Sequence, residues 1–448
     1  MKDRLILAIL IVVSWIVLFI FHKYLPFEPV VYIMLAFMAG YAMLIHIADL
    51  HRRRKYKKLI EKGKFQGKSF EELNYEPFVS IIIPAHNEEK VIRDTVGNML
   101  AVDYKKFEII VIDDRSDDST AEVLKQINEE KPEVKYFIRN KNAFPGKSAV
   151  LNDALEISQG EIICVFDADA RIEPDFLKKI LPYLAEPEVG AVQARKVIIN
   201  RDTNRLTRCQ DNEYLLDTSY TSGRDSIRGA VELRGNGQLV KREAVVDVGG
   251  WNNYTITDDL DLSTRLHLNG WDVRFAEDVC VYEEGITSFI PLLKQRRRWI
   301  EGSLRRYLEY FTDILTSRKI SLRATIDMLA FLTEIIFPVW IISEYCIQGI
   351  RFVKGTEDNI IYTLLILPAL ALFFIIGLVY SIRKYMKFSL PKTIIQSIET
   401  GIYMVVIWFP MVIYIICKVI FFKKTMDWGK TEHGLHMQET EKLVRQAD

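Results

Sequence analysis

Five apolar stretches flank one long polar block, and this distribution restricts the fold more than any other feature of the sequence. Two stretches precede the block and three follow it, at residues 5–21, 30–45, 335–350, 360–380 and 402–422. A helix of about 20 apolar residues can cross a bilayer. No small-residue cleavage site follows the first stretch, which argues against a secretory signal peptide. The sequence therefore predicts an integral membrane protein with four or five spans.

The charge pattern predicts the orientation of the polar block. The segment "HRRRKYKK" at His51–Lys58 directly follows the second stretch, and positively charged loops stay on the cytoplasmic side. We therefore expect a cytosolic block on a protein of the cell (inner) membrane. The five cysteines are scattered and lack CxxC spacing, so neither a disulfide framework nor a zinc site is indicated. Lys+Arg and Asp+Glu both total 59, so the net charge is zero and gives no evidence about nucleic acid. We expect no nucleic-acid partner.

These features divide the chain into four parts. Two transmembrane helices are expected in residues 1–52, a cytosolic domain in 75–310, an interfacial helix with two or three spans in 311–424, and a polar tail in 425–448. The interfacial helix is expected at 310–330, where tyrosine, leucine and isoleucine alternate with basic residues.

The polar block has the pattern of an α/β domain. Strand-like apolar runs begin the segments "FVSIIIPAHNE" (78–88) and "FEIIVIDDRSDDST" (107–120), and "YFIRN" and "EIICVFDADA" repeat the pattern. Helix-like segments lie between them, and Ser119 or Asp118 can cap the helix "AEVLKQINEE". Strand–helix alternation at this spacing predicts a mostly parallel, doubly wound sheet.

Three of the expected strands end in polar clusters, at Pro84–Glu88, Asp113–Asp114 and Asp167–Asp169. Ligands bind beyond the carboxyl ends of the strands in such sheets. Asp167 and Asp169 fall on the same side of an extended chain, and Mg²⁺ is commonly held by one or two carboxylates with substrate phosphates and water. The sequence thus predicts a metal-assisted site for a diphosphate leaving group.

Two further clusters each allow two interpretations. In "TITDDLDLSTRLHLNGWD" (255–272), Asp258 and Asp259 either complement the dipole of a helix N-terminus or supply a general base for an acceptor hydroxyl. In "KQRRRWIEG" (294–302), the arginines either anchor the chain at the membrane or bind diphosphate through their planar forks. The two interpretations of the second cluster are compatible.

Seven short motifs occur in the order "PAHNE", "DDRSDD", "GKSAVLN", "DADA", "RGNGQLVKR", "TDDLDLSTRL" and "QRRRW", over residues 78–305. In this the chain resembles the membrane-bound, cellulose-synthase-like inverting glycosyltransferases of family 2. The resemblance implies a cytosolic GT-A type domain that binds a UDP-sugar, with transmembrane helices on either side. It also implies a single displacement that gives a β-linked product.

The same resemblance implies contacts to the donor. Pro84, Glu88 and Asp114 would contact the uridine part of the UDP-sugar, and Lys147 would lie close to the same pocket. The sugar-diphosphate and its Mg²⁺ or Mn²⁺ would be held by Asp167 and Asp169.

The resemblance further implies the residues that act on the acceptor. Asp259 matches the last position of the family motif Thr-Glu-Asp and would be the catalytic base. Asp258 stands where the motif has glutamate, so either aspartate of the pair could be the base. Gln295, Arg298 and Trp299 match the Q-x-x-R-W pattern, which sits over the diphosphate and acceptor site.

The acceptor is either diacylglycerol or a growing glycan. The Q-x-x-R-W pattern favours a processive synthase of cellulose, hyaluronan or poly-N-acetylglucosamine. Phrases such as "ELRGNGQLVKR", "EEGIT" and "QRRRWIEGSLRRYLEY" resemble family members that add one glucose to diacylglycerol. A polymer path needs polar residues inside the spans, and the C-terminal spans carry few, with Glu334, Glu344 and Gln348 falling in one segment. We therefore expect a glycolipid synthase that has membrane lipids as partners. An inactive sugar-nucleotide-binding scaffold is the third alternative.

Overall fold

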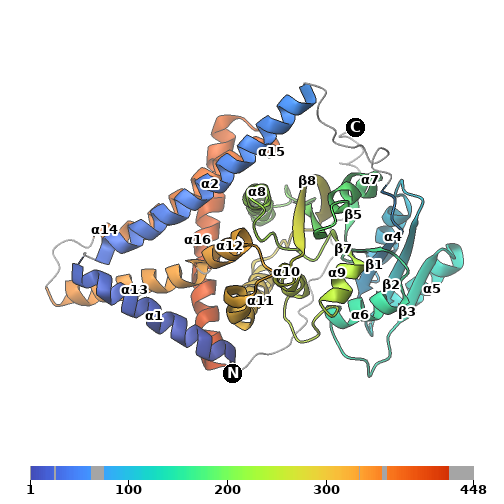
Figure 1. The fold of residues 1–448 in the computed structure, drawn as a ribbon, viewed down its shortest axis with the longest axis horizontal. Helices are drawn as coiled ribbons and strands as arrows, with labels where there is room; N and C mark the ends of the chain where they lie inside the picture. Colours follow the sequence, from blue (N-terminus) through green and yellow to red (C-terminus); the bar gives the residue numbers. More distant parts are fainter. Residues whose placement is uncertain (1, 25–26, 62–74, 332, 356–360, 423–448) are drawn as a thin grey trace.

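The computed structural model describes residues 2–24, 27–61, 75–331, 333–355 and 361–422. The described chain has two halves, one built on a sheet covered by helices and one of long helices that splay away from it (Figure 1). The polar tail expected at 425–448 lies outside the described residues.

The described residues form one sheet of eight strands in the order β3-β2-β1-β4-β7-β6-β8-β5. Their bounds are β1 Val79–Ala85, β2 Phe107–Asp113, β3 Val134–Ile138, β4 Ile162–Val165, β5 Arg171–Ile172, β6 Val189–Ile198, β7 Gln238–Lys241 and β8 Asp272–Glu283. The first four pair in parallel, as do β6 and β8. Only β7 and the short β5 pair antiparallel with their neighbours in the described sheet. The predicted mostly parallel α/β fold is confirmed.

Apolar side chains bury both faces of the parallel strands. Ile81 and Ile83 of β1 belong to one core cluster, and Ile82 between them belongs to the cluster on the opposite face. This is the alternation expected of a strand. It explains why β1 reads as a continuous apolar run, because neither face meets water.

Helices cover the two faces of the sheet. They are α4 Ile92–Leu100, α5 Thr120–Glu130, α6 Lys147–Ile157, α7 Phe176–Ile180, α8 Arg205–Ser226, α9 Arg242–Asp247 and α10 Asp258–Leu268, with a 3-10 turn at Leu181–Leu184. At the start of α5 the Asp118 carboxylate accepts the Thr120 N–H at 3.0 Å, whereas Ser119 makes no side-chain cap. Of the two residues proposed to cap this helix, Asp118 therefore contacts its backbone.

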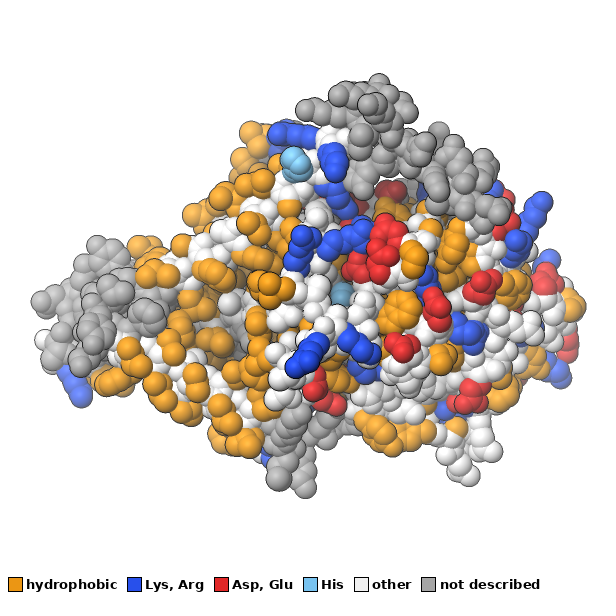
Figure 2. Space-filling model, in the orientation of Figure 1, with side chains coloured by type: hydrophobic (Ala, Val, Ile, Leu, Met, Phe, Trp, Pro, Cys, Tyr) orange, Lys and Arg blue, Asp and Glu red, His pale blue; other side chains and the backbone are white. Residues whose placement is uncertain are grey.

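The second half consists of helices, most of them long and apolar. They are α1 Lys2–Tyr24, α2 Phe27–Glu61, α11 Phe289–Thr316, α12 Leu322–Phe331, α13 Thr333–Val353, α14 Ile361–Leu364, α15 Ile366–Met386 and α16 Leu390–Phe421. Hydrophobic side chains cover this half, and charged ones gather over the sheet half (Figure 2). The segment 310–330 contains the end of α11 and most of α12 instead of one helix.

Four helical segments of the described chain are long and apolar enough to cross a membrane. They are Tyr32–Lys55, Ile336–Val353, Ile366–Met386 and Leu390–Phe421. The helix over the first predicted stretch has a shorter apolar part, Arg4–Val17. The chain is therefore a membrane-associated protein. Its orientation and the division into four parts stay predictions.

Helices α8 and α11 join the two halves. Helix α8 packs against α2, α15 and α16 and also against β6 and β8, while α11 packs against α16, α1 and α10. Ion pairs reinforce this contact, as between Arg52 of α2 and Asp225 of α8 at 2.6 Å. The apolar helices therefore adjoin the part of the sheet that carries the predicted site.

Candidate active site

A cavity of about 1000 Å³ lies between the sheet and the apolar helices. Its lining includes all of the predicted site residues except one. These are Pro84, Glu88, Lys147, Asp167, Asp169, Asp258, Asp259, Gln295, Arg298 and Trp299. Residues far apart in the chain thus meet in one place, as the strand-end argument expects.

The two aspartates that follow β4 lie in different surroundings. The backbone N–H of Asp167 donates to Asn236 Oδ1 at 3.2 Å, and Lys147 Nζ donates to Asp167 Oδ1 at 2.6 Å. The Asp167 side chain is 41% exposed, whereas Asp169 is buried. The more exposed carboxylate therefore faces the cavity with an ammonium group already at its side.

Lys147 begins helix α6 and lies among carboxylates. Burial alone would lower the pKa of its ammonium group, but Asp167, Asp258 and Asp259 outweigh burial and raise it. Lys147 is therefore cationic at every physiological pH, and it can balance negative charge brought in by a diphosphate.

Asp258 and Asp259 begin helix α10, where the helix dipole favours negative charge. Burial raises the pKa of Asp258 to about 6, since desolvation outweighs the opposing field of Lys147. Its Oδ2 atom is buried and has no hydrogen-bond partner among the described residues. Asp259 Oδ1 instead accepts the N–H of Leu260 at 2.8 Å. The two neighbours therefore differ, and both line the cavity.

In the motif "RGNGQLVKR", the backbone at Gly235 passes close to Asp259 and Lys147. Gly235 has a φ of +81°, and a Cβ placed on it would lie 3.1 Å from Asp259 Oδ2 and 3.5 Å from Lys147 Nζ. Glycine therefore suits the left-handed conformation, and the Cβ of any other residue would lie tightly against Asp259. The sequence pattern alone did not assign this role to Gly235.

Asp114 does not line the cavity described by the other predicted residues. Its carboxylate is buried and accepts hydrogen bonds from Arg139 Nη1 at 2.7 Å, Arg115 Nε at 2.8 Å and the Gly146 N–H at 3.2 Å. Asp114 therefore fixes the loop that leads into Lys147, and its contact with uridine stays a prediction.

The "QRRRW" segment lies on α11, and its three arginines have different environments. Gln295, Arg298 and Trp299 line the cavity, while Arg296 is completely buried. Arg296 Nη2 donates to Glu213 at 2.8 Å, and its guanidinium lies 4.3 Å from the centre of the Trp299 ring. Arg296 thus positions a site residue.

Sequence reasoning missed Arg296 although the signal was present. Leu292, Ile300 and Leu304 are buried on α11 at four-residue intervals, and Arg296 completes that row. An arginine in a buried row needs a buried partner, which Glu213 provides.

A second buried ionic cluster was also missed. Glu232 lines the cavity and lies 2.7 Å from Arg306, 3.6 Å from Arg224 and 3.7 Å from Arg234. Burial would raise the pKa of its carboxyl, but these arginines outweigh burial and hold the pKa well below its usual range. Arg306 also reaches the carbonyl of Leu260, the residue after Asp259, at 3.4 Å. The cluster therefore braces the start of α10.

The donor set at the strand end fits a hard divalent cation that arrives with phosphate. No group of three or more His, Cys, Asp or Glu side chains is arranged to hold a metal in the part of the chain that the structure describes. Asp167 and Asp169 supply carboxylate oxygens to the cavity, and Mg²⁺ commonly takes its remaining ligands from substrate phosphates and water.

The same cavity continues between the membrane helices. Its far part is lined mostly by apolar side chains of α2, α13, α15 and α16, among them Met38, Phe337, Leu370, Phe374, Val405, Phe409, Val412 and Ile416, and the same helices also contribute the polar side chains of His46, Thr333, Tyr380 and Ser381. One cavity thus joins a charged end, with the predicted catalytic residues, to an apolar end between candidate spans.

The comparisons with known proteins agree with this architecture. A family described as "Glycosyltransferase like family 2" matches residues 77–302. The beta-monoglucosyldiacylglycerol synthase of Trichormus variabilis is 38% identical over 365 residues, covering 80% of this chain and 76% of that protein. The synthase of the same name from Synechocystis sp. is 35% identical over 376 residues, covering 82% and 77%.

A solved structure shows a similar fold. The mannosyltransferase PcManGT from Pyrobaculum calidifontis, in complex with GDP-Man and Mn²⁺, superposes with a TM-score of 0.54 at 21% identity. The match covers 82% of this chain and 98% of that one. This similarity supports the GT-A type of the sheet domain.

Proposed function

This chain belongs to glycosyltransferase family 2, and we propose that it transfers one glucose from UDP-glucose to 1,2-diacylglycerol, giving a β-linked monoglucosyldiacylglycerol. It is a hexosyltransferase similar to beta-monoglucosyldiacylglycerol synthases. The observation that carries the choice of acceptor is the single cavity with a charged end and an apolar end.

The apolar end of the cavity suits acyl chains better than a polysaccharide. A glycan passing between spans would need polar groups along its path. Glu344 and Gln348 of α13 are buried and hydrogen-bonded to each other at 2.9 Å, and neither lines the cavity. The polar side chains that these helices do contribute, such as His46, Tyr380 and Ser381, are fewer than the apolar ones. A diacylglycerol could place its chains among the apolar side chains and its hydroxyl towards the charged end.

In the proposed reaction, Asp259 accepts the proton of the acceptor hydroxyl as its oxygen attacks the anomeric carbon of the donor sugar. The bond from that carbon to the diphosphate breaks, and UDP leaves from the opposite face, which inverts the configuration. A divalent cation, Mg²⁺ or Mn²⁺, held by Asp167 and Asp169 would offset the charge that develops on the diphosphate. Lys147 lies beside Asp167 at 2.6 Å and would add its own positive charge.

The remaining cavity residues orient the reactants in this proposal. Arg298 would bind the diphosphate through its fork, and Gln295 and Trp299 would border the sugar and acceptor. Asp258, ionised above its raised pKa of about 6, would add negative charge beside Asp259. Pro84 and Glu88 would border the uridine. The sheet domain would face the cytosol, where UDP-sugars are made available.

The test incubates membranes containing the full chain with radiolabelled UDP-glucose and diacylglycerol. We expect label in a chloroform-soluble lipid that migrates as a one-sugar diacylglycerol. Label only in an ethanol-insoluble polymer would refute the lipid acceptor and favour the processive synthase, which the Q-x-x-R-W pattern supports.

The Asp259→Asn variant tests catalysis itself. Loss of a general base should reduce turnover roughly 10²- to 10⁴-fold, with UDP binding retained. Asp94→Asn is the matched control, because Asp94 is exposed, with 63% of its side chain accessible, and lies outside the cavity lining. Equal activity of the two variants would contradict the assignment of Asp259 as the base. Absence of turnover in membranes that contain the wild-type chain would support the inactive scaffold.

A further inference from the structure

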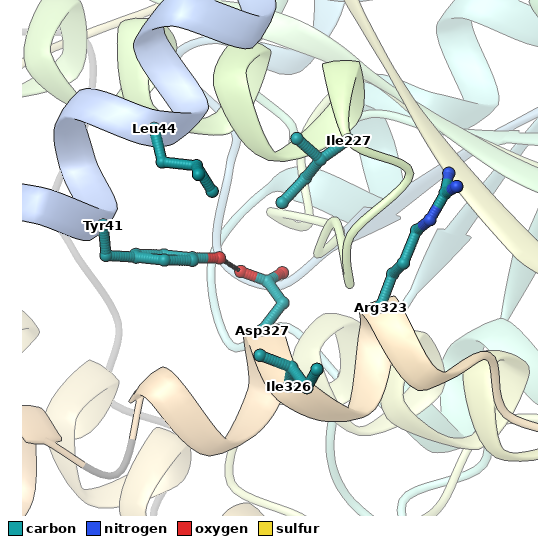
Figure 3. Close-up of a pocket in the computed structure, with 6 residues that line it drawn as sticks. All are labelled: Tyr41, Leu44, Ile227, Arg323, Ile326 and Asp327. Carbon is teal, nitrogen blue, oxygen red and sulfur yellow. Dashed lines mark hydrogen bonds between the residues drawn. The ribbon is translucent and has the colours of Figure 1, made fainter.

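A second cavity, of about 310 Å³, lies between α2 and α12 (Figure 3). It is lined by Tyr41, Leu44, Ile227, Arg323, Ile326 and Asp327. We call it the α2–α12 groove. Helix α2 contains a candidate span, and α12 leads directly into α13, which contains another. The groove therefore lies where the sheet half meets the membrane helices.

The polar floor of the groove is already satisfied. The Asp327 carboxylate accepts hydrogen bonds from the Tyr41 hydroxyl, from Arg224 Nε at 2.8 Å and from the Ala230 N–H at 2.7 Å. Figure 3 shows Tyr41 and Asp327 pointing at each other across the groove. Since Arg224 neutralises Asp327, the floor does not supply a charge for a ligand.

The walls of the groove are apolar and accessible. Leu44 is 58% exposed and Ile326 is 55% exposed, and Leu322, one helical turn before Ile326 on α12, is 74% exposed. A chain of methylene groups could cover these side chains, and the hydrophobic effect would favour that contact. The shape and chemistry of the walls thus suit an acyl chain.

The edge of the groove carries a cation. Arg323 is exposed, and no ion pair or hydrogen bond to its guanidinium occurs among the described residues. In Figure 3 the Arg323 side chain stands apart from the other five residues, and its guanidinium points away from Asp327. A guanidinium binds phosphate through two parallel hydrogen bonds, so Arg323 is complementary to an anionic headgroup above an apolar groove.

We infer that the α2–α12 groove binds one anionic phospholipid, with an acyl chain along Leu44, Ile227 and Ile326 and the phosphate at Arg323. The combination of an exposed cation and apolar walls on helices that adjoin candidate spans favours a membrane lipid over a soluble anion. The inference does not depend on the identity of the acceptor, because the groove shares only Tyr41 with the lining of the active-site cavity.

The test counts lipids bound to the purified full chain by native mass spectrometry. The probes are dioleoyl phosphatidylglycerol and zwitterionic dioleoyl phosphatidylcholine, each titrated into detergent micelles, with inorganic phosphate as a competitor. The wild-type chain should retain one phosphatidylglycerol more strongly than phosphatidylcholine. Arg323→Gln should weaken phosphatidylglycerol binding roughly tenfold or more, since it removes a charge-assisted hydrogen bond pair.

Two further variants make the result specific. Arg318→Gln is the matched control, because Arg318 is an exposed arginine outside the groove lining, and it should retain binding. Ile326→Trp fills the groove from an exposed position and should release both lipids. All variants should share the wild-type thermal midpoint, and their glucosyltransfer with saturating acceptor should be unchanged.

Three outcomes would overturn the inference. They are equal retention of the two lipids by the wild-type chain, equal loss of phosphatidylglycerol from Arg318→Gln and Arg323→Gln, and displacement of phosphatidylglycerol by inorganic phosphate at similar concentration. The second would mean that only the general positive charge of the surface attracts the lipid. The third would mean a phosphate site without an acyl groove.

Discussion

Replacing Asp258 by asparagine should stabilise the folded chain, and the gain should grow with pH. Burial raises the pKa of Asp258 to about 6 from an ordinary 3.8. Above the higher of these values the folded chain holds an ionised, poorly solvated carboxylate, which unfolding would return to water. At about 1.4 kcal/mol per pH unit, the difference destabilises the folded state by on the order of 3 kcal/mol at neutral and alkaline pH.

The sign follows from the order of the two pKa values. Below about pH 4 the carboxyl is protonated in both folded and unfolded chains, so the variant gains little. As pH rises from about 4 to 6, only the unfolded chain releases the proton, and the wild-type chain loses stability over that window. Asparagine has nearly the same shape and no charge, so Asp258→Asn should escape this loss.

The measurement is the thermal midpoint of the purified full chain in detergent with EDTA, compared at about pH 5 and pH 8. The midpoint of Asp258→Asn should exceed that of the wild-type chain by a larger margin at the higher pH. Asp258→Glu is the matched control, because it keeps a carboxyl at the position and should keep the pH dependence. A margin independent of pH, or a glutamate variant that behaves like asparagine, would refute the argument.

Three other perturbations test the rest of the site. Arg296→Met should destabilise the chain by about 3–5 kcal/mol because it leaves the buried Glu213 carboxylate without a cationic partner. Thermal unfolding of Arg297→Met, which changes an exposed neighbour, should show no such loss. Gly235→Ala should lower the free energy of unfolding by about 1–2 kcal/mol through backbone strain. Its steady-state glucosyltransfer rate should fall further than this loss of stability explains, since the new methyl group would crowd Asp259. EDTA should abolish glucosyltransfer, and Mg²⁺ or Mn²⁺ should restore it, while the midpoint of the donor-free protein stays the same.

The sequence was most informative where a local pattern determines the position of a residue. Apolar runs determine β1, β2 and β4, and the parallel arrangement brings their carboxyl ends to one edge of the sheet. That reasoning was sufficient to bring Pro84 and Asp167 to one cavity. It did not reveal that Asp114, on the same edge, is enclosed by arginines, because Arg139 lies 25 residues away.

The features that sequence reasoning missed depend on contacts between distant segments. The insertion of β7 between β4 and β6 is antiparallel and leaves no periodic signal. The pairing of Arg306 with Glu232 spans 74 residues. The apolar part of the cavity exists only because α2, α13, α15 and α16 pack around it. Such features become visible only in the folded structure, whereas the row Leu292–Arg296–Ile300 could have been recognised from helical spacing alone.

The buried polar network around Glu213 explains how the candidate span α16 and the site residues on α11 can be held in a fixed position relative to each other. Glu213 accepts hydrogen bonds from Arg296 at 2.8 Å, the Tyr403 hydroxyl at 3.1 Å and Trp408 Nε1 at 3.0 Å. The last two belong to α16, a candidate span, and Arg296 belongs to α11 beside Trp299. In a low-dielectric setting such charge-assisted contacts have few alternative geometries. An acceptor held among the apolar side chains can react only if its hydroxyl reaches the carboxylates, so this register fixes the depth at which the proposed transfer takes place.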